Sequence, residues 1–145
     1  MLHQFVYISH QVDEFTLEGL RELMIQSRAK NKRLELTGLL LFDPPLFFQV
    51  LEGPEASIQQ IAADIKADKR HRDMDIIYTN DNLFEREFSR WRMGFRFLGT
   101  GDESSYQHLD ERVKRLLRMS NPNGQLAHDA LVEFSEMDTK YFDLP

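Results

Sequence analysis

The fold is decided by the stretch LTGLLLFDPPLFFQVL, residues 36–51, which holds two apolar runs separated by a short turn. Leu36–Phe42 and Leu46–Leu51 have the length of strands, and Asp43-Pro44-Pro45 between them is typical of a turn. We therefore predict a β-hairpin in the middle of a sheet. Because both faces of these strands are apolar, the sheet needs a covering layer on each side.

The segments on either side of the hairpin alternate between the periods of strands and helices. They predict, in chain order, a strand at Leu2–Ser9, a helix from Thr16 to about Asn31, the hairpin, a helix from Pro54 through Ile65, and strands at Asp73–Thr79 and Trp91–Leu98. The order β-α-β-β-α-β-β indicates an α+β fold, namely a ferredoxin-like sheet with one extra strand.

Beyond Gly99 the pattern changes to that of two amphipathic helices, which we expect at residues 102–118 and 124–137. Asn121-Pro122-Asn123-Gly124 would form the turn between them. The first two helices can cover one face of the sheet, and we expect these last two to cover the opposite face. The chain would then consist of a domain at residues 1–98 and a C-terminal helical segment at residues 99–145.

The composition excludes several classes of protein. A net charge of −6 over 145 residues makes the chain a poor general binder of nucleic acid. It has no cysteine, which excludes disulfides, thiolate metal sites and cysteine nucleophiles. Its five histidines lack the spacing of metal ligands. The longest apolar run is too short to span a bilayer, and the first residues lack a signal-peptide pattern, so we expect a cytoplasmic protein without a membrane partner.

Strand parity brings a few chemically distinctive side chains to one face of the sheet. Tyr7, Gln49, and Trp91 with Met93 on the last strand are expected to converge beneath the first two helices. Gln49 lies within an apolar strand, where an unpaired amide would cost about 1–3 kcal/mol. It needs partners for its carbonyl and its NH₂ group, and a tyrosine hydroxyl or the polar edge of a ligand could supply them.

Each of these residues, taken alone, also has an ordinary structural role. Tyr7 could be a strand aromatic with its hydroxyl at the sheet rim. Trp91 and Met93 could fill the core. Asn31 could cap the C-terminal end of the first helix, and Gln49 could be a satisfied structural amide. No single residue therefore indicates a function.

Five blocks of sequence, spread over Met1 to about Leu98, contain these residues. The blocks are Phe5-Val6-Tyr7-Ile8-Ser9; Asn31 followed by Leu36-Thr37-Gly38-Leu39-Leu40-Leu41; Phe47-Phe48-Gln49-Val50-Leu51-Glu52-Gly53-Pro54; Asp68-Lys69-Arg70-His71-Arg72-Asp73; and Phe88-Ser89-Arg90-Trp91-Arg92-Met93. In combination they resemble the BLUF family of blue-light sensors, and because all five occur in the right order and spacing, the resemblance is specific. It is to the short, single-domain members of the family.

The resemblance implies FAD, or FMN or riboflavin with the same ring, bound non-covalently between the first two helices and against the sheet. By motif match, Tyr7 is the redox-active tyrosine and Gln49 is the amide that links it to the flavin edge. Asn31 would hydrogen-bond the flavin C4 carbonyl and N3 region. Arg70 and His71 match a loop that approaches the flavin, with a solvated loop as the alternative.

The last strand would carry the signal away from the flavin. Trp91 and Met93 match the residues that respond to the state of Gln49, and which of them lies nearer the flavin stays open. Arg92 stands where a small serine is common, and parity places it on the far face, toward the C-terminal helices. Two further departures are the stiff turn at Asp43-Pro44-Pro45 and Asp64, which replaces a basic or polar flavin contact.

The resemblance implies a photoreceptor without an attached catalytic domain. Light would drive proton-coupled electron transfer from Tyr7 through Gln49, and the signal would pass to a protein partner or a homo-oligomer through the C-terminal helices. A basic side on the first of these helices and an acidic tail could form such a contact, or both could be solvated faces. The alternatives are a flavin oxidoreductase, which lacks a nicotinamide fingerprint here, and a light-independent binding module.

Overall fold

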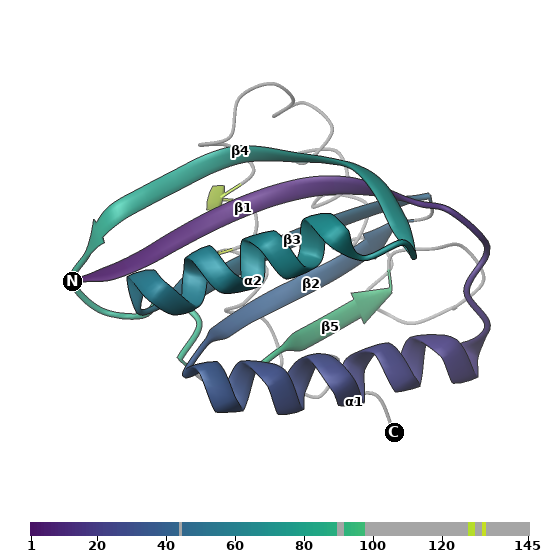
Figure 1. Cartoon of the computed structure of the whole chain (residues 1–145), viewed down its shortest axis with the longest axis horizontal. Helices are drawn as coiled ribbons and strands as arrows, with labels where there is room; N and C mark the ends of the chain where they lie inside the picture. The colour runs from purple at the N-terminus through teal and green to yellow at the C-terminus, as the bar shows by residue number, and fades with distance from the viewer. Residues whose placement is uncertain (44, 90–91, 98–127, 130–131, 133–145) are drawn as a thin grey trace.

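The structure, a computed structural model, describes residues 1–43, 45–89, 92–97, 128–129 and 132 (Figure 1). Its elements are, in order, β1 (Leu2–Gln11), α1 (Leu17–Leu34), β2 (Thr37–Asp43), β3 (Leu46–Gly53), α2 (Glu55–Ala67), β4 (His71–Leu83) and β5 (Gly94–Phe97). Within these residues the strands form one mixed sheet in the order β4-β1-β3-β2-β5. The predicted α+β fold of the ferredoxin-like type is confirmed.

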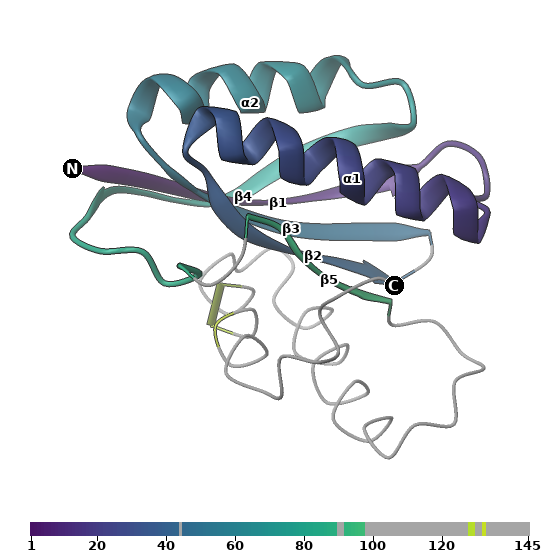
Figure 2. The same ribbon diagram turned by 90° about the horizontal axis from the view of Figure 1, so that it is seen from below.

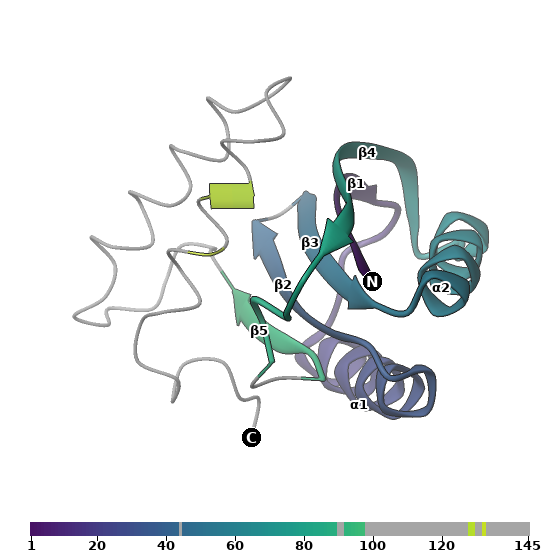
Figure 3. The ribbon, with the colours of Figure 1, turned by 90° about the vertical axis from the view of Figure 1, so that its left-hand side faces the viewer.

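Both helices lie on the same face of the sheet (Figures 2 and 3). Thr16 begins α1 by accepting a hydrogen bond from the Gly19 N–H at 2.9 Å. The helix ends at Glu35, whose φ of 59° is left-handed and whose N–H bonds to the carbonyls of Asn31 and Lys32. The helix therefore continues past Asn31, and the alternative that Asn31 is its C-cap is wrong. No helix within the described residues is long and apolar enough to cross a membrane.

The central strands β3 and β1 set the register of the site. β1 pairs antiparallel with β3, and Tyr7 lies directly opposite Gln49. On its other side β3 pairs antiparallel with β2, and Gly38 lies opposite Leu51. A Cβ atom at Gly38 would come within 2.1 Å of the Val50 carbonyl oxygen, so only glycine fits this close approach.

Alternate residues of the strands build two separate apolar layers, as strand parity predicts. The layer between the sheet and the helices includes Phe5, Leu40, Phe47, Leu51, Met24 and Ile61. The layer on the opposite face includes Val6, Ile8, Leu39, Leu41, Phe48, Val50 and Phe88. Val132, which is helical, packs against this second layer. The predicted helices at residues 102–118 and 124–137 otherwise lie outside the described residues.

The last strand is shorter than the sequence predicts. β5 pairs parallel with β2 and begins at Gly94, whereas a strand was expected from Trp91, which lies outside the described residues. The carbonyl oxygens of Arg92 and Met93 accept hydrogen bonds from the side chains of Asn31 and Arg28. Because α1 side chains hold these carbonyls, residues 92–93 form a bend instead of continuing the ladder.

Candidate functional site

A cleft opens between α1, α2 and the face of the sheet that they cover. It contains a cavity of about 190 Å³ that is open to solvent on one side. Its apolar walls come from the sheet, from both helices and from the loop before α1, with Leu23, Leu40, Phe47, Leu51, Ile61 and Phe15 among them. A planar aromatic ligand would find apolar surface on either side and a few polar groups to orient it.

Three buried side chains form a connected chain on the floor of the cleft. The Tyr7 hydroxyl donates a hydrogen bond to Gln49 Oε1. Gln49 Nε2 in turn donates to the sulfur of Met93 at 3.2 Å. All three residues line the cleft and are at most 5% exposed. The structure thus brings together three of the four residues that strand parity predicted, and it satisfies the Gln49 amide with a tyrosine hydroxyl.

The surroundings of Tyr7 keep its phenol protonated. Burial raises the pKa of Tyr7 above its usual value, and the negative charge of Asp68 raises it further. Ionisation of the phenol would leave an uncompensated charge beneath the helices. Tyr7 is therefore present as a hydrogen-bond donor, and among the described contacts Gln49 Oε1 is the acceptor for its proton.

Asn31 connects the cleft to the segment that carries Met93. Its side chain is 1% exposed and lines the cleft. Its amide donates to the carbonyl of Arg92 at 2.6 Å, and Arg28 Nε donates to the carbonyl of Met93 at 3.0 Å. The bond to the Arg92 carbonyl uses one of the two N–H donors of the Asn31 amide. The amide can therefore bind a ligand and hold the backbone of Arg92 at the same time.

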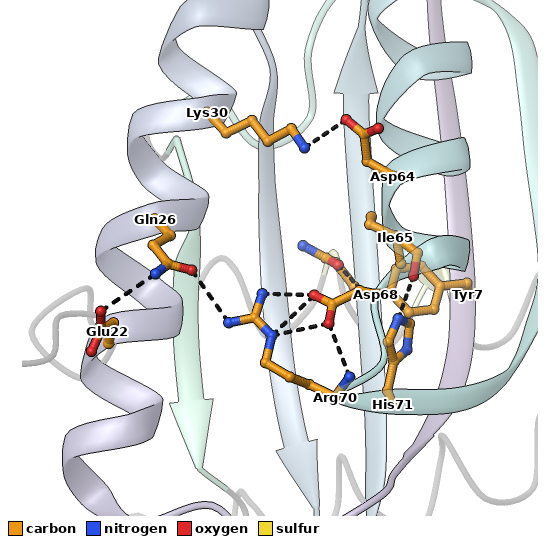
Figure 4. Close-up of polar contacts among 10 residues, drawn as sticks. Tyr7, Glu22, Gln26, Lys30, Asp64, Ile65, Asp68, Arg70 and His71 are labelled. Carbon is orange, nitrogen blue, oxygen red and sulfur yellow. Dashed lines mark hydrogen bonds and ion pairs between the residues drawn. The ribbon is translucent and has the colours of Figure 1, made fainter.

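Arg70 and His71 border the cleft beside Tyr7 (Figure 4). The Arg70 guanidinium pairs with Asp68 at 2.6 Å and donates to Gln26 on α1 at 3.3 Å. Burial alone would raise the pKa of Asp68, but hydrogen bonds from Arg70 and its positive charge outweigh burial and lower that pKa. His71 Nε2 lies 2.5 Å from the Ile65 carbonyl, and its ring centre lies 6.2 Å from that of Tyr7.

An ion pair spans the cleft between the two helices. Lys30 Nζ on α1 lies 2.5 Å from Asp64 Oδ2 on α2, and both side chains line the cleft (Figure 4). The carboxylate at position 64 was predicted to replace a basic or polar contact, and the structure supplies the positive charge from the facing helix. The pair closes over part of the cleft as two partly exposed groups.

Arg92 lies in the bend just before β5. The residue is exposed, and its guanidinium donates to the Leu36 carbonyl at 3.3 Å, where α1 leads into β2. Residue 92 precedes β5, so strand parity does not apply to it, and the expected contact with the C-terminal helices stays a prediction because those helices lie outside the described residues. Trp91, the fourth residue expected at the cleft, lies outside the described residues.

Residues 2–94 match the family model described as BLUF, sensors of blue-light using FAD. The chain belongs to the BLUF family. It is accordingly a blue-light sensor that binds a flavin.

Other BLUF proteins share the sequence and the fold. The blue light- and temperature-regulated antirepressor BluF of Escherichia coli (strain K12) is 37% identical over 71 residues, 49% of this chain and 18% of the relative. A bacterial light-regulated adenylyl cyclase has a TM-score of 0.74 at 27% identity, over 83% of this chain and 35% of the cyclase. BlrB in its dark state has a TM-score of 0.75 at 23% identity, over 92% and 96%, and shows the shared fold. This chain thus spans a small part of the first two proteins.

Four polar residues of this BLUF cleft were missed or only partly read from the sequence. Gln26 and Lys30 on α1 were not identified, and neither was the pairing of Asp64 on α2 and of Asp68, the C-cap of α2, with cations. The signal that could have found them is spacing. Gln26 and Lys30 are four residues apart, and so are Asp64 and Asp68. This spacing places the two members of each pair on one helix face, and the two polar faces meet across the cleft.

Proposed function

We propose that the cleft between α1 and α2 holds the flavin and that Tyr7 and Gln49 are the photoactive pair. The observation that carries this proposal is the buried chain from the Tyr7 hydroxyl through Gln49 to Met93. The apolar walls suit the faces of a flavin ring, and Asn31 offers an amide to its polar edge. Arg70 and His71 would border the ring. FAD is the expected cofactor, because the family description names it, and FMN and riboflavin share the same ring.

The photoactive pair moves one electron and one proton. When bound, the flavin absorbs blue light and becomes a strong oxidant. Tyr7 would give an electron to the bound flavin, and Gln49 would give it a proton from Nε2. The Tyr7 hydroxyl proton would pass to Gln49 Oε1, so that Gln49 would become its imidic tautomer or rotate. The electron and a proton then return to Tyr7. The net change is a new hydrogen-bond pattern of the Gln49 side chain.

The signal leaves through Met93. Rotation of Gln49 would turn its NH₂ group away from the Met93 sulfur, and tautomerisation would leave Nε2 with a single N–H. Met93 leads directly into β5. Residues 1–98 would form the light-sensing domain, and residues 99–145 would pass the change to a protein partner or a second copy of the chain. The antirepressor activity in the name of the E. coli relative supports a protein partner. The chain would act in the cytoplasm by protein contact rather than by catalysis.

Illumination of the purified protein tests the proposal. We expect flavin absorbance in the dark, a reversible red shift under blue light, and release of the flavin into the supernatant after acid precipitation. A colourless protein would favour a light-independent binding module. Steady turnover of NAD(P)H would favour a flavin oxidoreductase, and either result would contradict the proposal.

The raised pKa of Tyr7 predicts the response to alkali. A free tyrosine ionises near pH 10, whereas burial holds the folded-state pKa of Tyr7 above that value. The amplitude of the red shift should therefore stay constant from pH 7 to about pH 10.5. Because the unfolded chain loses this proton first, the free energy of unfolding should fall as the pH rises above about 10.

Absorption spectra measured together with circular dichroism separate these two effects. The amplitude of the red shift should remain constant at every pH at which the circular dichroism spectrum is that of the folded protein. A half-loss of amplitude near pH 10 in a protein that is still folded would show that Tyr7 ionises normally, and it would contradict the buried-donor assignment.

A further inference from the structure

A buried carboxylate lies on the face of the sheet opposite the cleft. The Glu52 side chain, near the end of β3, is fully buried. Its Oε1 accepts hydrogen bonds from Gln4 Nε2 at 3.1 Å and from the Glu87 N–H at 3.0 Å. Its Oε2 accepts from the Thr37 hydroxyl at 2.8 Å and from the Phe88 N–H at 2.7 Å. Four donors thus converge on one carboxylate.

The Glu52 carboxylate is held by neutral donors. The nearby Arg86 guanidinium bonds to the Glu52 backbone carbonyl, the Glu35 carbonyl and the Thr37 hydroxyl. A buried charge is tolerated only when its hydrogen bonds are complete, and bonds to an ionised acceptor are the strong ones. The Glu52 carboxylate therefore fixes its donors in place more firmly than a neutral side chain would.

The donors of Glu52 come from β1, from β2 and from the connection between β4 and β5. Gln4 lies on β1, three residues before Tyr7, and Thr37 lies at the start of β2. Glu52 itself lies on β3, three residues after Gln49 and on the other face. Glu87 and Phe88 belong to the connection between β4 and β5, which leads to Met93.

The connection that carries Met93 is held at two places. Glu52 holds the backbone N–H groups of residues 87 and 88, and the Phe88 ring is 1% exposed in the apolar layer beside them. Five residues later, Asn31 and Arg28 hold the carbonyls of residues 92 and 93. The first anchor, Glu52, lies on β3, the strand that carries Gln49. It therefore couples the position of the β4–β5 connection to the position of the Gln49 amide.

We propose that Glu52, on the opposite face of the sheet, is a positioning residue that fixes where Met93 lies relative to Gln49. The inference rests on the proposed function, because it assigns Glu52 a part in the response that Gln49 starts. Glu52 does not line the cleft, so its effect reaches the flavin site only through the backbone. Loss of the anchor should let Met93 move relative to Gln49 while the flavin stays bound.

The substitution Glu52→Gln tests this with little change in shape. An amide NH₂ group cannot accept, and each Glu52 oxygen accepts from one backbone N–H, that of Glu87 or that of Phe88. In either amide orientation the variant therefore loses one of these two backbone bonds. Glu55→Gln is the matched control, because it makes the same change three residues later at an exposed position.

The first measurement is the ¹³C-methyl resonance of Met93 in the dark, assigned with Met93→Leu. We expect Glu52→Gln to shift this resonance and Glu55→Gln to leave it unchanged. In the dark after illumination, Glu52→Gln should change the recovery rate about fivefold, the factor that corresponds to one hydrogen bond of about 1 kcal/mol. The flavin dissociation constant should stay within about twofold in both variants, because neither residue lines the cleft.

A double mutant separates positioning from general stability. In a Met93→Ala background, Glu52→Gln should have little further effect on the recovery rate, since its route to Gln49 is gone. A lower melting temperature with an unchanged Met93 resonance and recovery rate would show a merely structural role and overturn the proposal. If Glu52→Gln does not fold, Thr37→Val removes one of the four donors and should produce the same effects to a smaller degree.

The Met93 resonance also distinguishes the two proposals from each other. A protein without a light-induced shift would contradict the proposed function, yet the resonance in the dark would still report whether Glu52 positions Met93. A protein with a normal photocycle and an unmoved resonance in Glu52→Gln would contradict the positioning role alone.

Discussion

Replacement of Tyr7 by phenylalanine is expected to abolish the light-induced red shift completely while the flavin stays bound. Only a hydroxyl is lost, and the ring keeps its place in the apolar layer beneath the helices. Without the hydroxyl, the hydrogen bond to Gln49 Oε1 disappears, and so does the proton that must accompany the electron. Absorption spectra before and after blue light would measure the loss, and flavin content per chain would confirm binding.

Tyr78→Phe is the control for this experiment. Tyr78 lies on β4, and its ring stacks on His128 instead of lining the cleft. Removal of its hydroxyl should leave the red shift unchanged. A normal shift in Tyr7→Phe, or an equal loss in both variants, would contradict the assignment of Tyr7 as the donor.

A single added methyl group at Gly38 should be among the most destabilising changes in the sheet. The Cβ atom of Gly38→Ala would lie 2.1 Å from the Val50 carbonyl oxygen and 3.0 Å from a Leu51 methyl carbon. The nearest obstacle is backbone, so β2 and β3 would have to separate where they flank Gln49. We expect the free energy of unfolding to fall by about 3 kcal/mol or more, beyond the usual cost of overpacking.

Urea unfolding of this variant should be compared with that of Gly19→Ala. At Gly19, in the first turn of α1, the nearest atom to an added Cβ is the Thr16 hydroxyl at 3.2 Å. The gain in helix propensity, about 1 kcal/mol, offsets that tight contact. A loss of less than 1 kcal/mol in Gly38→Ala, close to that of the control, would show that the pairing of β2 and β3 tolerates a side chain there.

The parts of the fold that could be predicted are those set by local periodicity. Residues 36–51 alternate between two apolar faces, so the hairpin and the facing of Gln49 toward the helices follow from the sequence. The same parity applied to β1 explains why Tyr7 meets Gln49. The roles of these residues came from the resemblance to the BLUF family, because a buried tyrosine and a buried amide alone are also structural.

The parts that could not be predicted depend on contacts between distant segments. β5 begins late because side chains of α1, Asn31 and Arg28, hold the carbonyls before it. The Lys30–Asp64 pair needs the spacing of two helices, which no local pattern gives. Glu52 was read only as part of a motif at the end of a strand, although its parity with Phe48 and Val50 already indicated a buried carboxylate.

The shortness of β5 makes it the part of the sheet that a small light-induced change can detach. The strand has four residues and bonds to β2 among the described strands, so it is the cheapest part of the sheet to detach. In the proposed mechanism, light changes one hydrogen bond at Met93, and a single bond of this kind is worth about 0.5–1.5 kcal/mol net. A difference of that size changes the ratio of docked to released strand by roughly twofold to tenfold. The switch would thus act as a graded bias on a mixed population, with a partner or a second copy amplifying it, rather than as an all-or-none change in each molecule.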